Sequence, residues 1–144
     1  MQSAISSKKP LDCIWNGTCM KIVALIARIL LGLVFLIFGL NGFLHFIPGA
    51  LPPGLAGQFA GALMQSHYMH FVSGVQVAGG VLLLANRFVP LALALLGPVI
   101  VNILLFHLLL FPQGLVTAVL VAALWIVLFI RYRQNFSGLF VQRA

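Results

Sequence analysis

The chain has 144 residues, of which 62% are hydrophobic and 6% are charged, and its formal net charge at pH 7 is +7. A soluble domain carries about 25% charged residues, so this composition excludes a water-covered globular surface and predicts apolar surface that faces lipid. The basic residues form no stripe with interleaved aromatics, which argues against nucleic acid as a partner. Asp12 is the one acidic residue, so the apolar stretches hold no carboxylate for a proton relay or for a hydrolase with paired acids.

The chain starts with a polar extension, residues 1–21, which contains Lys8, Lys9 and Lys21 and leads into an apolar run over residues 22–44. At a rise of about 1.5 Å per residue, this run is long enough to cross a hydrocarbon core of about 30 Å. A signal peptide would end in small residues, whereas this run leads into Phe43-Leu44-His45. We therefore expect a retained membrane span.

The rest of the chain is divided by turns. Residues 48–54 are rich in Pro and Gly and predict a loop, and residues 56–66 predict a short amphipathic helix at the membrane surface. Asn86-Arg87 and Pro112-Gln113-Gly114 are two further turn signals. The predicted membrane spans are residues 22–44, 69–85, 88–111 and 115–130.

The basic residues predict how these spans are oriented. With four spans, every Lys and Arg except Arg28 falls on one side of the membrane, and the positive-inside rule places that side and both termini in the cytoplasm. Three or five spans would break the pattern. We therefore predict an all-α protein, an integral membrane four-helix bundle with antiparallel up-down topology. Residues 22–131 form its one domain, between the extension 1–21 and a basic cytoplasmic tail, 132–144. The basic residues on the cytoplasmic side are Lys8, Lys9, Lys21, Arg87, Arg131, Arg133 and Arg143.

Polar side chains in or beside the spans lie toward the opposite, outer side. Polar groups in hydrocarbon are costly unless they are paired or face water. The polar side chains on the outer side therefore indicate one of two arrangements. They form a polar vestibule that binds a small molecule, or they pair with one another and hold the helices together. The main candidates for ligand contacts are Asn41, Gln76, Asn102 and His107, and the weaker ones are His45, His67 and His70.

Three other sets of side chains could carry chemistry: two histidines, one arginine and two cysteines. His67 and His70 share a helix face, but the spans hold no carboxylate to orient the imidazoles and no metalloenzyme signature appears, so we predict no metal site. Arg28, a weaker site candidate, is expected to extend its side chain to lipid phosphates, or alternatively to hold an anion or a quinone oxygen. Cys13 and Cys19 are expected to be free thiols in a reducing compartment.

Small residues predict where helices approach closely in lipid. Such positions follow one another along the first span and recur in the second. They are Gly32, Gly39, Gly42, Gly74 and Ala78.

Three pairs of segments carry a family resemblance through their order and spacing. They are residues 27–33 with 38–43, residues 76–84 with 86–93, and residues 98–103 with 106–107. Over residues 20–140 the chain resembles the DoxX family of small bacterial membrane proteins. The resemblance implies a four-helix bundle in the bacterial cytoplasmic (inner) membrane, and kinship with a quinone-reducing thiosulfate oxidoreductase subunit and with redox-stress complexes.

The chain departs from this family at two positions. Many relatives carry Glu where Gln76 stands and another acid where Trp125 stands, so the loss of both acids weakens any proton-coupled role that the resemblance implies. Gln76 can still hydrogen-bond a quinone carbonyl or a partner helix.

Together these observations lead us to expect an accessory subunit of a membrane redox system. It would bind quinone or a small solute in an outward-facing intramembrane pocket, hold no cofactor tightly, and leave electron transfer to a partner protein. Besides the lipid bilayer, its partners would be a membrane or redox protein or further copies of the chain. Two alternatives stay open, a non-catalytic membrane scaffold or lipid-binding protein and a small-solute transporter.

Overall fold

The computed structural model describes the backbone of residues 17–140 and the side chains of residues 17–136. Within residues 17–140 all regular structure is helical, which confirms the predicted all-α class. Four longer helices, a short helix and two 3-10 segments follow one another along the chain. They are α2 (Thr18–Leu44), α3 (Leu55–Gln65), α4 (Tyr68–Leu84), α5 (Val89–Leu109), η1 (Pro112–Gly114), α6 (Leu115–Tyr132) and η2 (Arg133–Phe140).

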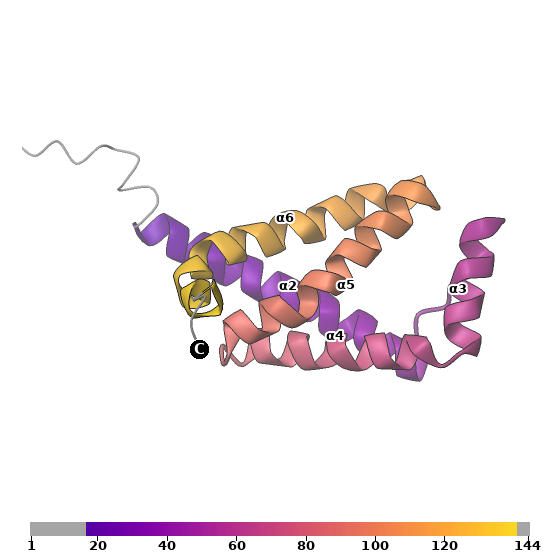
Figure 1. Ribbon diagram of the computed structural model, residues 1–144, viewed down its shortest axis with the longest axis horizontal. Coiled ribbons are helices and arrows are strands. Elements are labelled where there is room, and N and C mark those ends of the chain that lie inside the picture. Colours follow the sequence, from indigo (N-terminus) through magenta and orange to yellow (C-terminus); the bar gives the residue numbers. More distant parts are fainter. Residues whose placement is uncertain (1–16, 141–144) are drawn as a thin grey trace, which may run out of the picture.

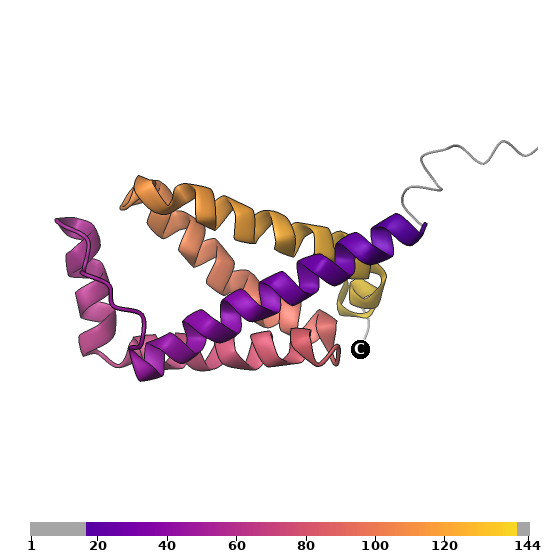
Figure 2. The same ribbon diagram turned by 180° about the vertical axis from the view of Figure 1, so that it is seen from behind.

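The four longer helices alternate in direction, and they converge at one end of the molecule and diverge at the other (Figures 1 and 2). We call the converging end the basic end, because Lys21 in the first turn of α2, Arg131 in the last turn of α6 and Arg87 between α4 and α5 lie there. The diverging end is called the histidine end, after His45 at the end of α2, His67 before α4 and His107 near the end of α5. The short helix α3 stands at the histidine end, beyond the tips of the longer helices.

The most extensive helix contact joins α2 and α4, and it depends on glycine. A Cβ placed on Gly80 would lie 2.8 Å from the Leu36 amide nitrogen and 2.9 Å from the Gly32 carbonyl oxygen. Because these are backbone atoms, only a residue without a side chain allows the two helices to approach so closely. The prediction of close approach is wrong for Gly74, because its Cβ position has nothing within 4 Å.

The apolar core lies toward the basic end, where α2, α4, α5 and α6 meet. Five of its leucines are fully buried, while other large apolar side chains of the same helices are exposed on the outside of the molecule. An exposed apolar surface of this extent is stable when lipid covers it. The fully buried core leucines are Leu31, Leu83, Leu93, Leu96 and Leu128.

Two side chains donate hydrogen bonds to backbone carbonyls of neighbouring helices. Arg28 Nη1 donates to the carbonyl of Leu83 at 3.2 Å in the last turn of α4, and the same carbonyl also accepts from the Asn86 amide at 3.2 Å. Trp125 Nε1 donates to the carbonyl of Leu93 at 2.9 Å, next to the stretch of α5 where Pro98 has no N–H to offer. Trp125 thus links α6 to the part of α5 that precedes Pro98.

By length and composition, three helical segments within residues 17–140 are able to cross a membrane, and they indicate a membrane protein. They are Thr18–Leu44, Val89–Leu109 and Pro112–Phe136. The fourth predicted span corresponds to α4, an apolar helix of 17 residues. Its length of about 26 Å at 1.5 Å per residue is slightly less than a hydrocarbon core of about 30 Å.

Candidate functional site

A cavity of about 440 Å³ opens at the histidine end, where the four longer helices diverge. We call it the main cavity. Phe35 and Val121, which also belong to the core, form part of its wall, so the cavity begins where the core ends. Its volume falls in the range of pockets that hold small organic ligands, about 300–1,000 Å³. Six polar side chains line it among apolar ones: Asn41, His45, His70, Gln76, His107 and Thr117.

A second cavity of about 240 Å³ lies between α3, α4 and α5. We call it the side cavity. Phe59 on α3 and Phe106 on α5 both line it, and their rings pack against each other with centroids 6.0 Å apart. The two cavities share wall residues, so they are neighbouring chambers. The shared residues are Met64, Met69, Gln76, Ile103 and His107.

Gln76 lies in the wall that the two cavities share, and it is only 7% exposed. No described residue hydrogen-bonds its side-chain amide. The amide offers two donors and an acceptor, and its nitrogen and oxygen are not among the sealed side-chain atoms without a partner in the described part of the chain. Its polar atoms can therefore be satisfied by a molecule in either cavity.

Gln76 continues a row of polar residues on α4. His70, Ser73 and Gln76 follow at three-residue spacing, so they lie along one side of the helix. His70 Nδ1 and Ser73 Oγ are buried, and neither has a hydrogen-bond partner in the described part of the chain. Ser73 lies behind the wall of the main cavity, against Gly42, where any Cβ would collide with its hydroxyl oxygen. We call these three residues the polar row of α4.

Asn41 and His107 are held in place by backbone groups. The Ile47 amide donates to Asn41 Oδ1 at 2.7 Å where the chain leaves α2, so the oxygen of Asn41 is occupied and its NH₂ group remains available. His107 Nδ1 lies 2.8 Å from the carbonyl oxygen of Ile103, one helical turn earlier in α5. The ring of His107 also packs edge-on against Phe106, with centroids 5.3 Å apart.

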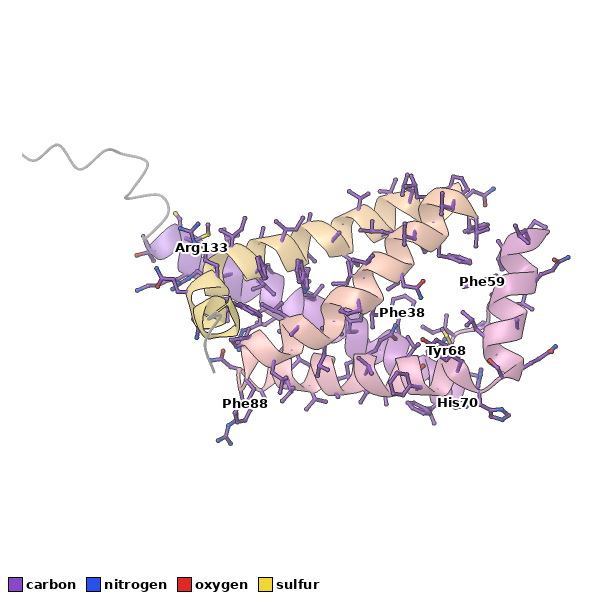
Figure 3. The ribbon with its side chains drawn as sticks, viewed as in Figure 1. Phe38, Phe59, Tyr68, His70, Phe88 and Arg133 are labelled. Carbon is purple, nitrogen blue, oxygen red and sulfur yellow. The ribbon has the colours of Figure 1, made fainter. Side chains whose placement is uncertain are left out.

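The structure brings some of the predicted site residues together and places others elsewhere. Asn41, His45, His70, Gln76 and His107 line the main cavity, and Gln76 and His107 also line the side cavity together with Asn102. Figure 3 shows His70 at the histidine end, on the same side of the molecule as Tyr68 and Phe59.

His67 and Arg28 line neither cavity. The exposed ring of His67 stacks on that of His70, with centroids 5.5 Å apart, and Arg28 binds Leu83 toward the basic end. Among the residues that the structure describes, no three His, Cys, Asp or Glu side chains come close enough to hold a metal ion.

Sequence analysis did not select three residues that form or support the cavity wall. The spacing of Ser73 in the sequence could have identified it, because it lies three residues after His70 and three before Gln76. Thr117 is a polar residue in an apolar span and contributes the polar group of α6 to the main cavity. Met64 from α3 lines both cavities, and no signal in the sequence distinguishes it from a lipid-facing residue.

Comparison with known protein families, with curated proteins and with solved structures found no match for this chain.

Proposed function

We propose that this chain is a multi-pass membrane protein that binds a small amphipathic molecule of the quinone type in the main cavity. The observation that carries the proposal is Gln76, a buried residue whose amide has no hydrogen-bond partner among the described residues and which lies in a wall shared by two cavities. In a membrane, a polar group of this kind is stabilised by a partner helix, by water or by a ligand. No described helix supplies a hydrogen bond, and the amide faces space of ligand size.

The composition of the cavity fits an amphipathic ligand. Its walls are mostly apolar, with residues such as Val34, Phe38 and Ile103, and its polar groups are amides, imidazoles and a hydroxyl. Pockets for small organic molecules combine a large apolar lining with a few polar groups that fix orientation. Such amides and imidazoles can hold and orient a ring with oxygen substituents, but they do not exchange electrons. The chain is therefore the ligand-binding subunit, and electron transfer belongs to a partner protein.

The arrangement of helices supports a path for the ligand from the bilayer. The side cavity lies between α3 and α5, and Phe59 and Phe106 are the aromatic pair at its wall. A molecule dissolved in lipid would enter between these helices and reach Gln76, which both cavities share. Such a route suits an apolar ligand, because it never requires the ligand to leave the membrane.

We further propose four membrane spans with both termini in the cytoplasm. Helix α2 ends at the histidine end, and α5 begins at the basic end. The chain must therefore return across the molecule between them, and α4 is the segment that does so. The basic residues at the end where α2 starts and α6 finishes support a cytoplasmic location for that end. The bacterial inner membrane, and membership of the DoxX family, are supported by the sequence resemblance alone.

The test is thermal unfolding of the purified protein in detergent, with increasing concentrations of a short-tailed benzoquinone. A ligand that binds only the folded state raises the unfolding midpoint with concentration. We expect such a rise for the wild type and at least about tenfold weaker binding for Gln76→Leu, equivalent to about 1.4 kcal/mol. Gln113→Leu, the same change at an exposed position outside both cavities, is the control and should behave as wild type.

A wild-type protein whose midpoint does not move at saturating benzoquinone would contradict the quinone proposal. Co-purification of a stable partner from native membranes, together with an unmoved midpoint, would favour the scaffold alternative instead.

A further inference from the structure

We infer that the main cavity prefers molecules whose polar head donates a hydrogen bond, such as phenols, quinols and long-chain alcohols. Molecules of the same shape whose oxygens can only accept, such as ethers and oxidised benzoquinones, should bind more weakly than their hydroxylated or reduced counterparts. This inference rests on the proposed function, because it specifies the chemical class of ligand for the same cavity. It is carried by the hydrogen bond that orients His107.

The backbone determines which nitrogen of His107 carries the proton. Nδ1 lies 2.8 Å from the carbonyl oxygen of Ile103, and a carbonyl oxygen only accepts hydrogen bonds, so Nδ1 must be the donor. A neutral imidazole has one N–H group, and Nε2 is then a hydrogen-bond acceptor. No described residue donates to Nε2.

Gly114 keeps this acceptor uncovered. A Cβ at position 114 would collide with Nε2 and Cδ2 of His107, so any other residue would displace the ring or fill the space beside Nε2. Both residues line the main cavity. Gly114 has φ −92° and ψ 3° as the residue before α6, which other residues also adopt. Its backbone conformation therefore does not require glycine, whereas its contact with the ring does.

The other oriented polar group of the cavity is a donor. The oxygen of Asn41 accepts from the Ile47 amide at 2.7 Å, which leaves its NH₂ group to donate. Gln76 offers both kinds of group. A hydroxyl can donate to His107 Nε2 and accept from one of the amides, whereas an ether oxygen can only accept. An ether would leave Nε2 without a donor in a mostly apolar cavity, and sites that hydrogen-bond a ligand hydroxyl reject analogues that lack it.

A para-alkylphenol and its methyl ether test the inference, because they differ only in the hydroxyl hydrogen. Their binding to the full-length protein is measured by thermal shift at about pH 8, where an imidazole in water is neutral. We expect the wild type to bind the phenol at least tenfold more tightly than the ether. His107→Phe and Gly114→Ala should both lose this preference and retain affinity for the ether, since the first removes the acceptor and the second covers it.

His67→Phe is the matched control, because it makes the same change at an exposed histidine outside both cavities, and its preference should equal that of the wild type. Equal binding of phenol and ether by the wild type would overturn the inference while leaving the proposed cavity in place. A preference that persists in both His107→Phe and Gly114→Ala would overturn it as well. Binding of neither compound to the wild type would overturn the proposed function and the inference together.

Discussion

At the scale of single residues, the polar row of α4 is the most unusual feature of the chain. Ser73 is 1% exposed and Gln76 is 7% exposed, in a helix that is otherwise apolar. Buried polar groups are nearly always hydrogen-bonded in folded proteins, so a row of polar side chains without hydrogen-bond partners among the described residues indicates a role other than stability. A polar residue in a span can pair two helices or bind a ligand. These two explanations predict opposite effects on the free energy of unfolding when the residue is replaced.

The residue-scale prediction concerns Gln76→Leu in the absence of ligand. Replacing an unsatisfied buried amide with an apolar side chain of similar size is neutral or stabilising. We expect the free energy of unfolding in detergent to stay the same or to rise by about 1 kcal/mol, as measured by denaturant or thermal unfolding. If Gln76 instead paired two helices, Gln76→Leu would lower the free energy of unfolding by about 1 kcal/mol. That outcome would exclude the ligand-binding role.

At the scale of helices, close contact between α2 and α4 determines where the cavity lies. The pair is tight at Gly80, against Leu36 and Gly32, and at Gly42, against Ser73. On the other side of the molecule, Trp125 joins α6 to α5 through Leu93. These two pairs meet in the core toward the basic end and diverge toward the histidine end (Figure 1), so the space between them becomes the main cavity.

Two glycines of α4 give the helix-scale prediction. Gly80→Ala introduces a methyl group against backbone atoms that cannot move aside, and we expect a loss of about 1–3 kcal/mol of unfolding free energy. Gly74→Ala adds the same methyl group where nothing lies within 4 Å, and the better helix propensity of Ala should leave stability unchanged or raise it by about 0.5–1 kcal/mol. Thermal unfolding of both variants in one detergent measures the difference. Equal effects of the two changes would mean that α2 and α4 do not approach each other at Gly80.

At the scale of the whole molecule, charge and polarity are separated along the long axis. Figure 3 shows Arg133 and Phe88 at one end, and His70, Tyr68 and Phe59 at the other. The sequence has no charged residue between Arg28 and Arg87 or between Arg87 and Arg131. The middle of the molecule is therefore an apolar band, which is the arrangement that a bilayer stabilises.

Cysteine labelling in intact cells tests the topology. Single cysteines are introduced at Gln65, Ala85 and Gln113 in a protein with Cys13→Ser and Cys19→Ser. With four spans, a membrane-impermeant reagent should label positions 65 and 113 and not position 85, because α4 returns the chain to the cytoplasm before α5. If α4 does not cross, positions 65 and 85 should react alike and position 113 should lie on the opposite side, which would contradict the four-span proposal.

The sequence by itself determined that the chain is helical and where its polar groups lie along each helix. Long apolar runs satisfy their backbone hydrogen bonds in lipid only as helices or closed barrels, and runs of this length favour helices. The fixed rise per residue then sets the position of Asn41, Gln76, Asn102 and His107 along their helices. The same rise places Arg28 in the part of α2 near the basic end, where it binds Leu83.

Only the tertiary structure decided which of these groups meet. The neighbours of a side chain depend on how each helix is rotated and crossed, and those angles are set by contacts between residues distant in the sequence, such as Gly80 with Leu36. For this reason the sequence could not place Asn102 in the side cavity, His67 outside both cavities, or Ser73 against Gly42. Periodicity constrains one helix at a time, whereas a cavity is formed by several helices together.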